Sequence, residues 1–267
     1  MQNFEQLAEL FKKHFEVKHF PATPASLYES CDYFLSLGGK RVRPVMCLMG
    51  NELFDKINAD AWDVATAIEL FHNFTLIHDD IMDAASLRRG MPTVHEKYGQ
   101  STALLAGDVM LVQAYEYLNK INSAYKHRIL ALFNKTAKEV CEGQQLDMDF
   151  EKKTDVQLQE YVRMIELKTS VLLAASLQMG AVLGGASEGN RQHIYEFGRN
   201  LGIAFQVQDD YLDAFGDPAK FGKDAGGDIR QNKKTFLLIH ALETASAEQK
   251  KMLQQLMREN PADKVQR

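Results

Sequence analysis

Apolar residues recur at steps of three and four along most of the chain. The clearest series are Leu104, Leu105, Val109, Val112 and Tyr115, and then Leu158, Tyr161, Val162, Ile165 and Leu172. This spacing is typical of the buried face of a helix, and no segment alternates apolar and polar residues as a half-buried strand does. No proline occurs between Thr93 and Asp217, so several long helices can run without interruption. The pattern predicts an all-α protein.

Turn-forming residues divide this pattern into helix-sized segments. Gly, Pro, Asn and Asp gather near residues 36–40, 55–60, 84–92, 119–126, 150–155, 184–190, 216–228 and 244–247. These breaks imply about eight or more helices and no linker long enough to separate two domains. We therefore expect one domain over residues 1–267, a bundle of long helices around a central cavity that holds the site.

Residues 170–187 contain no charged side chain for 18 positions. The stretch is long enough to be considered as a membrane span, but it includes Gln178, three glycines and three serines. We expect a helix that is buried on all sides and no membrane span.

Composition narrows the class of protein. The chain has 267 residues, of which 45% are hydrophobic, and a formal net charge of −5. This acidic balance argues against nucleic acid as a partner. Cys31, Cys47 and Cys141 form no C-x-x-C motif and are expected to be buried thiols in a reducing compartment. Residues 1–20 have no apolar signal core, so we expect a cytoplasmic protein.

An acidic pattern occurs twice, each time after an apolar run. Asp79-Asp80-Ile81-Met82-Asp83 and Asp209-Asp210-Tyr211-Leu212-Asp213 both read D-D-x-x-D. Residues four apart share a helix face, so the first and last Asp of each motif point the same way. Like charges at that spacing destabilise a helix unless a cation lies between them.

Two such motifs predict two carboxylate walls that face one another across hard cations. Mg²⁺ fits best because it takes oxygen ligands, keeps several waters and usually bridges to a substrate phosphate. The predicted metal ligands are Asp79, Asp80, Asp83, Asp209, Asp210 and Asp213.

Basic residues cluster in three glycine-containing segments. They lie in Gly38-Gly39-Lys40-Arg41-Val42-Arg43-Pro44, in Arg88-Arg89-Gly90, and at Lys223, Lys233 and Lys234. Arginine presents a planar fork to phosphate, and lysine a compact charge. We expect Lys40, Arg43, Arg88 and Arg89 to bind phosphate, whereas Arg41 and Lys234 are also explained as solvated neighbours.

Metal clusters and separate basic clusters together predict diphosphate chemistry with two phosphate sites. One diphosphate, bound through Mg²⁺, becomes a leaving group, and Lys and Arg hold the other without metal. An apolar interior beside them suits a hydrophobic tail and a carbocation that water must not reach.

Other classes explain part of the pattern. An all-α metal phosphohydrolase fits His72 and the His78-Asp79 pair, and a terpene cyclase fits an Asp-rich metal site, so both stay open. A di-iron bundle needs two E-x-x-H motifs in its core helices. Glu69-Leu70-Phe71-His72 reads so, but the other such tetrapeptide, Glu16-Val17-Lys18-His19, lies in a strongly charged segment, so we do not expect a di-iron site. A catalytically silent partner subunit is expected to lose Asp from one motif, whereas both motifs are intact.

An ordered set of motifs resembles the trans-type polyprenyl diphosphate synthases, which include the farnesyl and geranylgeranyl diphosphate synthases. The set is GGKRVRP, LIHDDIMD, LRRG, AGD at 106–108, GQQLD at 143–147, KT at 168–169, FQVQDDYLD and GKDAGGDIRQNKKT. It covers most of the chain, from Gly38 to Leu238. The resemblance implies the isoprenoid synthase fold and Mg²⁺-dependent condensation of isopentenyl diphosphate with an allylic prenyl diphosphate.

The resemblance also implies a role for each site residue. About three Mg²⁺ ions are expected with the allylic diphosphate, two at Asp79, Asp80 and Asp83 and a third at Asp209, with Asp210 and Asp213 nearby. The residues expected to bind the allylic diphosphate are Arg88, Lys168, Lys223 and Lys233, and those for isopentenyl diphosphate are Lys40, Arg43, His72 and Arg89. Thr169 and Gln206 are expected to face the developing cation, and Gly226-Gly227 to let the backbone approach closely.

Product length in this family depends on bulk before the first acidic motif. Phe74 lies five residues before Asp79, and Thr75 four before it, which puts Phe74 roughly 7–8 Å deeper along the helix. An aromatic at the first position and a small residue at the second resemble one class of geranylgeranyl synthases, although a helical wheel puts Thr75 more nearly below Asp79. Geranylgeranyl diphosphate is the expected product, and farnesyl diphosphate the alternative.

Members of the family are usually homodimers, and the apolar stretch 104–111 is a candidate contact surface. They usually continue with further C-terminal helices beyond the position of Arg267, so the resemblance implies either a short member or a truncated chain. The motifs leave the allylic starter and the pathway open.

Overall fold

The computed structural model describes residues 2–153, 155–216, 226–261 and 263–266. The chain divides into two compact units, one of Met1–Asn134 and Ala175–Tyr195, and the other of Lys135–Ala174 and Glu196–Arg267. They are called the first unit and the second unit below. The single domain expected over residues 1–267 stays a prediction.

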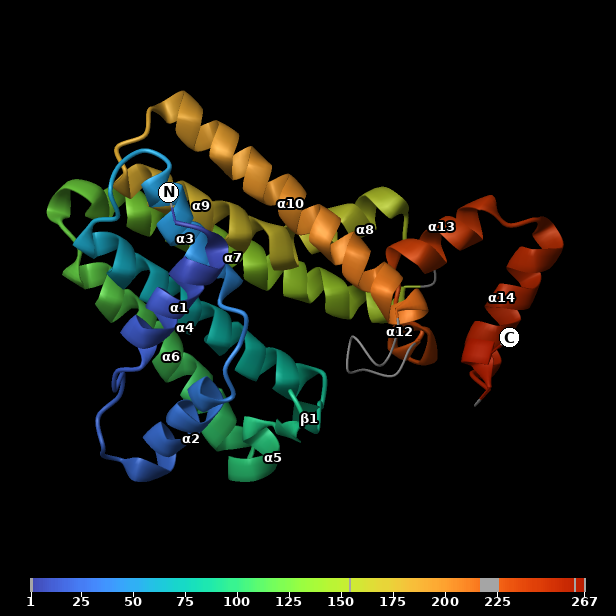
Figure 1. Ribbon diagram of the computed structural model, residues 1–267. Coiled ribbons are helices and arrows are strands. Elements are labelled where there is room, and N and C mark those ends of the chain that lie inside the picture. The colour runs from blue at the N-terminus through green and yellow to red at the C-terminus, as the bar shows by residue number, and fades with distance from the viewer. Residues whose placement is uncertain (1, 154, 217–225, 262, 267) are drawn as a thin grey trace. The chain divides into compact units, whose positions relative to one another are not determined.

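Helices make up most of the first unit (Figure 1). They are α1 (Phe4–Phe15), α2 (Ala25–Ser36), α3 (Val42–Glu52), α4 (Ala59–Met82), α5 (Val94–Tyr98) and α6 (Gln100–Lys120). Between α4 and α5, the strands β1 (Leu87–Arg88) and β2 (Met91–Pro92) pair antiparallel. Two-residue strands are too short for any alternation of apolar and polar residues, so the sequence pattern did not reveal them.

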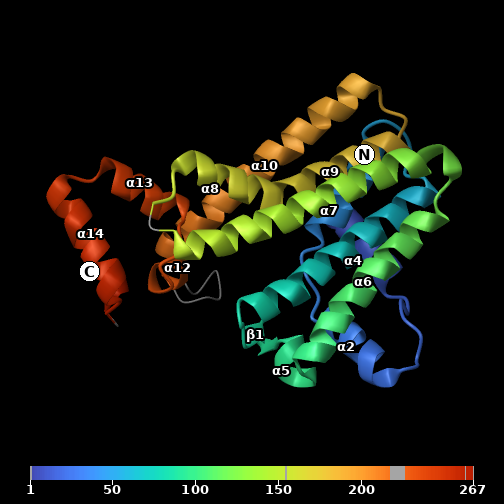
Figure 2. The same ribbon diagram turned by 180° about the vertical axis from the view of Figure 1, so that it is seen from behind.

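Helix α4 is buried along most of its length. Its N-cap residue Asn58 accepts a hydrogen bond from the backbone N–H of Ala61, 3.0 Å away, and so satisfies one of the free N–H groups at the helix start. Every residue from Val64 to Phe71 is buried. Helix α6 packs along α4 in both ribbon views (Figures 1 and 2). The first acidic motif therefore stands at the end of a core helix.

The buried face of α6 differs from the one its apolar series predicts. Its buried residues include the small side chains Ala103, Ala106, Gly107 and Ala114, which let a neighbouring helix approach closely. Leu104, Leu105, Val112 and Tyr115 are exposed instead, by 50, 54, 58 and 37%. The helix was predicted correctly, but most of the predicted apolar series lies on its outer face, because these small residues together with Met110, Tyr117 and Leu118 form the core side.

The second unit is also helical. It contains α8 (Leu158–Ile165), the π-helix η1 (Glu166–Ser170), α12 (Gly227–Arg230), α13 (Phe236–Thr244), α14 (Ala247–Glu259) and the 3₁₀ helix η2 (Lys264–Gln266). Three further helices contribute residues to both units, namely α7 (Ser123–Lys152), α9 (Val171–Leu183) and α10 (Glu188–Phe215). The core of the second unit consists of Phe150, Val156, Tyr161, Met164, Ile165 and Ile239, which confirms the buried helix face predicted around Tyr161 and Ile165.

Helix α9 covers most of the uncharged stretch, and nearly all of its residues are buried. One segment, Leu158–Leu183, is long and apolar enough to cross a membrane by length and composition, with a mean hydropathy of 1.2. Because 78% of its most apolar window is buried inside the protein, the segment has the character of a core helix, as predicted.

The three cysteines are free thiols, and two of them match the prediction of buried residues. Cys31 and Cys47 are buried, whereas Cys141 is exposed. Burial raises the pKa of Cys31 to about 12 and raises the pKa of Cys47 as well. The two buried thiols are therefore protonated and unreactive at neutral pH. The expectation of a buried Cys141 was wrong because its side of α7 faces solvent.

Candidate active site

The first acidic motif spans the end of α4. Asp79 and Asp80 belong to the last turn of the helix, and Asp83 is its C-cap residue. The backbone N–H of Asp83 donates to the carbonyl of Asp79, 2.8 Å away. Asp80 is only 2% exposed, whereas Asp79 is partly buried and Asp83 is exposed. The three carboxylates are therefore unequal in their access to solvent.

Arg88 binds the buried carboxylate of this motif. Its Nε lies 2.9 and 2.8 Å from the two oxygens of Asp80, and its Nη2 lies 2.8 Å from Oδ1. A forked contact of this kind is the geometry in which arginine binds carboxylates best. It compensates a buried charge that is costly alone and joins the LRRG segment to the acidic motif.

Arg89 connects two of the basic segments. It has a left-handed backbone with a φ of 54°, and it precedes Gly90 at 76°. Its guanidinium donates to the carbonyl of Gly38. A Cβ placed on Gly39 would lie 3.0 Å from Nη2 of Arg89, so the glycine leaves room for the guanidinium. The GGKR and LRRG segments therefore meet, through two residues that are 51 positions apart in the sequence.

His72 lies on α4 beside Arg43, whose Nη1 is 3.0 Å from Nε2 of the imidazole. Arginine can only donate, so Nε2 accepts and the ring is neutral with its proton on Nδ1. The pKa of His72 lies well below its ordinary value because of burial, and then because of the charges of Arg43, Arg89, Arg88 and Arg41. Burial also lowers the pKa of Arg43 and of Arg89.

The four guanidiniums around His72 are only half compensated. Arg88 has Asp80 and Arg41 has Glu69 as a partner, but Arg43 and Arg89 have no ion pair with a carboxylate in the part of the chain that the structure describes. The Nε of Arg43 is buried without a hydrogen-bond partner. The positive charges of Arg43 and Arg89 and the buried, unmet Nε donor of Arg43 favour a bound anion, so this region can hold a phosphate group.

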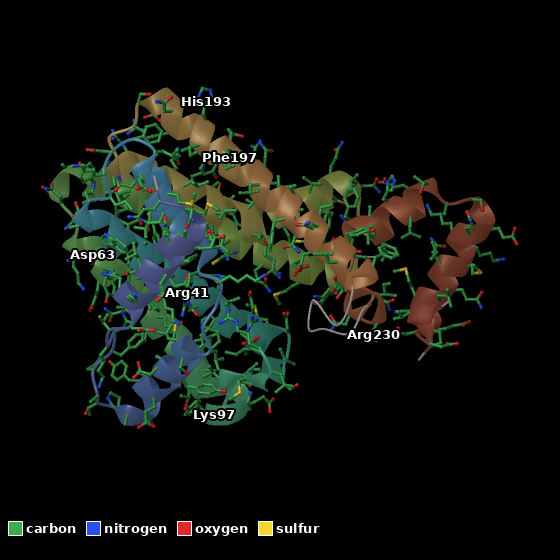
Figure 3. The ribbon with its side chains drawn as sticks, viewed as in Figure 1. Arg41, Asp63, Lys97, His193, Phe197 and Arg230 are labelled. Carbon is green, nitrogen blue, oxygen red and sulfur yellow. The ribbon has the colours of Figure 1, made fainter. Side chains whose placement is uncertain are left out.

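Arg41 (labelled in Figure 3) has a structural role within this cluster. Its ion pair with Glu69 is nearly inaccessible, with side chains 11 and 4% exposed, and its guanidinium lies 4.9 Å from the ring centre of Phe15. Asn73 donates to the same Glu69 oxygen at 3.0 Å. Glu69 is thus occupied within the protein, in agreement with the rejection of a di-iron site. Lys40, next to Arg41, is exposed.

The two candidate chain-length residues lie on different sides of α4. The hydroxyl of Thr75 donates to the carbonyl of His72 at 2.8 Å. The ring of Phe74 meets the ring of His78 edge-on, with centroids 4.8 Å apart. Nε2 of His78 in turn lies 3.1 Å from the carbonyl oxygen of Leu104 on α6, where Gly107 leaves space for the imidazole. His78 is therefore a packing residue, as expected, and Phe74 packs beside it.

The second acidic motif lies near the C-terminal end of α10, and its carboxylates also differ in their exposure to solvent. Asp209 is exposed, whereas Asp210 is 6% exposed. The hydroxyl of Tyr161 donates to Oδ2 of Asp210 at 2.5 Å, and the backbone N–H of Phe236 donates to the same oxygen at 2.9 Å. Burial raises the pKa of Asp210 despite these donors, and burial followed by the contact with Asp210 raises the pKa of Tyr161.

The third carboxylate of this motif binds the backbone that follows it. Oδ2 of Asp213 accepts from the N–H of Asp228 at 2.9 Å, and its carbonyl accepts from the N–H of Gly226 at 2.6 Å. Gly226 has a left-handed φ of 79°, a conformation that glycine adopts without strain. Nζ of Lys233 lies 3.4 Å from Oδ1 of Asp228. Lys223 lies outside the described residues.

Lys168 and Thr169 belong to the π-helix η1 rather than to regular α-helix. Nζ of Lys168 donates to Oδ2 of Asp147 at 2.5 Å, and Oγ1 of Thr169 donates to Oε1 of Gln206 at 3.2 Å. A Cβ on Gly143 would collide with the backbone of Lys168. The GQQLD segment of α7 therefore supports the KT segment twice, through a close backbone contact at Gly143 and through the carboxylate of Asp147.

The donor set of the two motifs fits hard cations, although no complete metal cage is built. In the described part of the chain, no three His, Cys, Asp or Glu side chains come together as a metal site. Mg²⁺ is usually held by one or two carboxylates, waters and substrate phosphates rather than by an all-protein cage. The oxygen donors of each motif, considered separately, therefore suit Mg²⁺ ions that also bind a diphosphate.

The structure adds residues to which the sequence analysis gave no role in the site. They are Glu69, Asp147, Tyr161 and Asp228, each bound to a predicted site residue or to its neighbour Arg41. Asp147 could have been found, because it ends the GQQLD motif. Tyr161 could not, because its place in an apolar series is also that of an ordinary core residue.

Comparison with known proteins shows where these motifs belong. The family model described as polyprenyl synthetase matches residues 24–267. A short chain isoprenyl diphosphate synthase of Methanocaldococcus jannaschii is 42% identical over 243 residues, which are 91% of this chain and 74% of that protein. A geranylgeranyl diphosphate synthase of Methanosarcina mazei is 44% identical over 222 residues, 82% of this chain and 68% of that protein.

A solved structure agrees with these sequence relatives. The crystal structure of geranylgeranyl pyrophosphate synthetase from Pyrococcus horikoshii Ot3 matches with a TM-score of 0.89 and 38% sequence identity, covering 98% of this chain and 84% of that one. The all-α, isoprenoid synthase type of fold is thereby confirmed. The chain belongs to the polyprenyl synthetase family.

Proposed function

We propose that the protein condenses isopentenyl diphosphate with an allylic prenyl diphosphate and releases a longer trans-polyprenyl diphosphate, geranylgeranyl diphosphate. The observation that carries this proposal is the half-compensated arginine cluster around His72, on the same helix that ends in the first acidic motif. An anion site at Arg43 and Arg89, which form no ion pair with a carboxylate among the described residues, favours two diphosphate substrates over the single one that a phosphohydrolase or a terpene cyclase uses.

The isopentenyl diphosphate is bound by the basic residues of the first unit. Arg43 and Arg89 supply guanidiniums that have no carboxylate partner among the described residues, and Lys40 adds an exposed ammonium. Neutral His72 accepts from Arg43 and orients that fork. Binding by fixed guanidiniums leaves the alkene of the substrate unperturbed, so it can act as the nucleophile.

The allylic diphosphate is bound by Arg88, Lys168, Lys233 and Lys223. These cations stabilise the diphosphate most strongly as the allylic C–O bond breaks and negative charge gathers on the departing oxygens. Asp147 holds Lys168 and Asp228 holds Lys233, so the charges are positioned before the substrate arrives.

Magnesium is the cofactor of this proposal, with ligands drawn from Asp79, Asp80, Asp83 and Asp209, and with Asp210 and Asp213 nearby. When bound, Mg²⁺ would neutralise diphosphate oxygens and make the diphosphate a better leaving group. The greater exposure of Asp83 and Asp209 supports these two as the most accessible ligands, and Asp79 is partly buried. Asp80, Asp210 and Asp213 contact protein groups.

The carbon chain reacts in three bond changes. The allylic C–O bond breaks, the alkene of isopentenyl diphosphate attacks the allylic cation, and a proton leaves the resulting cation for the released diphosphate. Oxygen atoms of Thr169 and Gln206, which already contact each other, face the developing positive charge. No side-chain base is required, because the diphosphate leaves with its oxygens free to accept the proton.

The proposed product is supported by the names of relatives and by two residues before the first acidic motif. Relatives at about 40% identity are named geranylgeranyl diphosphate synthases, and one at 40% is named geranylfarnesyl diphosphate synthase. Phe74 and Thr75 before the first motif support geranylgeranyl diphosphate over the farnesyl alternative.

A cytoplasmic homodimer completes the proposal. Leu104, Leu105, Val112 and Tyr115 form an exposed apolar stripe on α6, which supports a contact between two copies because covering large apolar side chains is favourable. The buried, protonated thiols of Cys31 and Cys47 need no oxidising compartment.

One assay tests the proposal. The protein is incubated with Mg²⁺, isopentenyl diphosphate and each short allylic diphosphate in turn, and the products are sized by chromatography. We expect geranylgeranyl diphosphate, and we expect Arg43→Lys to raise the KM for isopentenyl diphosphate about tenfold because a point charge replaces the fork. Arg128→Lys, on the exposed surface of α7, is the matched control. Release of diphosphate without a longer prenyl product would refute prenyl transfer.

A further inference from the structure

Tyr161 is a buried polar residue that the proposed reaction does not use. It lies on α8 and is 2% exposed. Apolar neighbours surround it in the core of the second unit, including Met164 and Ile239. A buried hydroxyl requires a partner, and this one donates to Oδ2 of Asp210 at 2.5 Å.

The same carboxylate oxygen binds the start of α13. Oδ2 of Asp210 accepts the backbone N–H of Phe236, the first residue of that helix, at 2.9 Å. This N–H is one of those that a helix start leaves without an internal partner. Thr235, the N-cap residue, accepts from Leu238 at 3.3 Å through its own side chain. One oxygen of Asp210 therefore ties α8, α10 and α13 together.

Further contacts extend this connection to a predicted substrate ligand. Asp213, one helical turn beyond Asp209, holds the N–H of Asp228, and Asp228 lies beside Lys233. Lys233 is three residues before Phe236, and its own N–H donates to the carbonyl of Asp228 at 3.0 Å. The segment from Asp228 to Phe236 is thus attached to α10 at both ends.

We propose that Tyr161 is a positioning residue: by holding Oδ2 of Asp210 it fixes the segment 228–236, and Lys233 with it, against the end of α10 that carries Asp209. The inference rests on the proposed function for the roles of Lys233 and Asp209. The hydrogen bonds behind the inference do not depend on that function, because every one of them lies within the second unit. The residues of the second acidic motif thus have different roles. Asp209 is exposed, whereas Asp210 and Asp213 accept hydrogen bonds from backbone N–H groups.

The test removes one oxygen atom. Tyr161→Phe keeps the ring that packs in the core and loses only the hydroxyl. We expect the KM for the allylic diphosphate to rise about tenfold, the effect of one lost hydrogen bond to a charged group, while the KM for isopentenyl diphosphate changes less than about twofold. A merely structural role would lower the yield of folded protein and leave both KM values unchanged.

Tyr117→Phe is the matched control. Tyr117 is also buried, 8% exposed, and its hydroxyl lies 2.9 Å from Nδ1 of His19 in the first unit. It touches no residue that the reaction is proposed to use, so its loss should reduce stability to a similar degree and leave both KM values unchanged.

A second measurement needs no turnover. Hydrogen exchange should become faster at the amides of residues 226–236 in Tyr161→Phe and stay unchanged there in Tyr117→Phe. The affinity for inorganic diphosphate in the presence of Mg²⁺, measured by calorimetry, should fall in the first variant alone. Unchanged exchange in folded Tyr161→Phe would overturn the inference. A wild-type protein without prenyl transfer but with the expected exchange difference would overturn the proposed function and leave the positioning role standing.

Discussion

His72 and Arg43 illustrate how burial sets the charge state of a residue. In water a histidine is partly protonated near pH 6.5, but burial first, and then a guanidinium 3.0 Å from Nε2 with three more nearby, lower the pKa of His72 and keep it neutral. Arg41, two residues before Arg43, is compensated by Glu69. Two arginines of one segment thus have different roles. Arg41 forms an ion pair inside the protein, whereas Arg43 is available to bind an anion.

The pKa of His72 predicts a pH dependence of stability. The folded protein keeps His72 neutral, whereas the unfolded chain binds a proton below about pH 6.5. The unfolded state then holds more protons, so the free energy of unfolding falls as the pH drops, by up to about 1.4 kcal/mol per pH unit from this group. Urea unfolding of wild type and of His72→Gln between pH 5 and 7.5 measures the difference.

In His72→Gln the slope below pH 6.5 should be smaller than in wild type. Phe197→Leu, at an exposed position of α10 (Figure 3), changes no titratable group and should keep the wild-type slope. Identical slopes in wild type and His72→Gln would contradict a depressed pKa.

At the scale of the element, an irregular helix carries two predicted site residues. The π-helix η1 interrupts α8 and α9 at Lys168 and Thr169, and π-turns inside helices are frequent at functional sites. The extra residue in the turn changes which way successive side chains point. Gly143 makes this irregular turn possible, because any larger residue there would meet the backbone of Lys168.

Gly143→Ala should therefore damage both stability and catalysis. The added methyl group forces η1 away from α7, at a cost of roughly 1–3 kcal/mol, and moves Lys168 and Thr169 with it. We expect a lower kcat and a higher KM for the allylic diphosphate, measured by steady-state kinetics beside thermal unfolding. Gly189→Ala, in a helix position where a Cβ meets nothing within 4 Å, should keep both, since alanine favours helix.

In the proposed function, helix α4 also limits the chain length of the product. Phe74 packs against His78 below the acidic motif, and removing its ring would open space about 7–8 Å from Asp79 along the helix. Phe74→Ala should shift the product toward longer chains, as sized by chromatography. Phe197→Ala, at an exposed position, is the control for a lost aromatic ring. An unchanged product distribution in Phe74→Ala would refute the length role.

At the scale of the whole molecule, the exposed apolar stripe on α6 bears on assembly. A charge introduced there should prevent two copies from burying it, because a desolvated charge without a partner is costly. Leu105→Glu should convert a dimer into a monomer, as measured by sedimentation. Met252→Glu, on the exposed surface of α14, should leave the mass unchanged. A wild-type monomer would contradict the proposed homodimer.

Much of this protein followed from its sequence alone. The three- and four-residue steps predicted helices, and the twofold D-D-x-x-D with its ordered companions led to the right family, because spacing within a helix and the residue types of a site are properties of neighbouring positions. Tertiary structure decided the rest. It paired Arg41 with Glu69 but left Arg43 uncompensated, buried Asp80 but exposed Asp83 and Cys141, and turned the small residues of α6 inward. Burial and charge partners arise from contacts between residues far apart in the chain, and no local pattern records them.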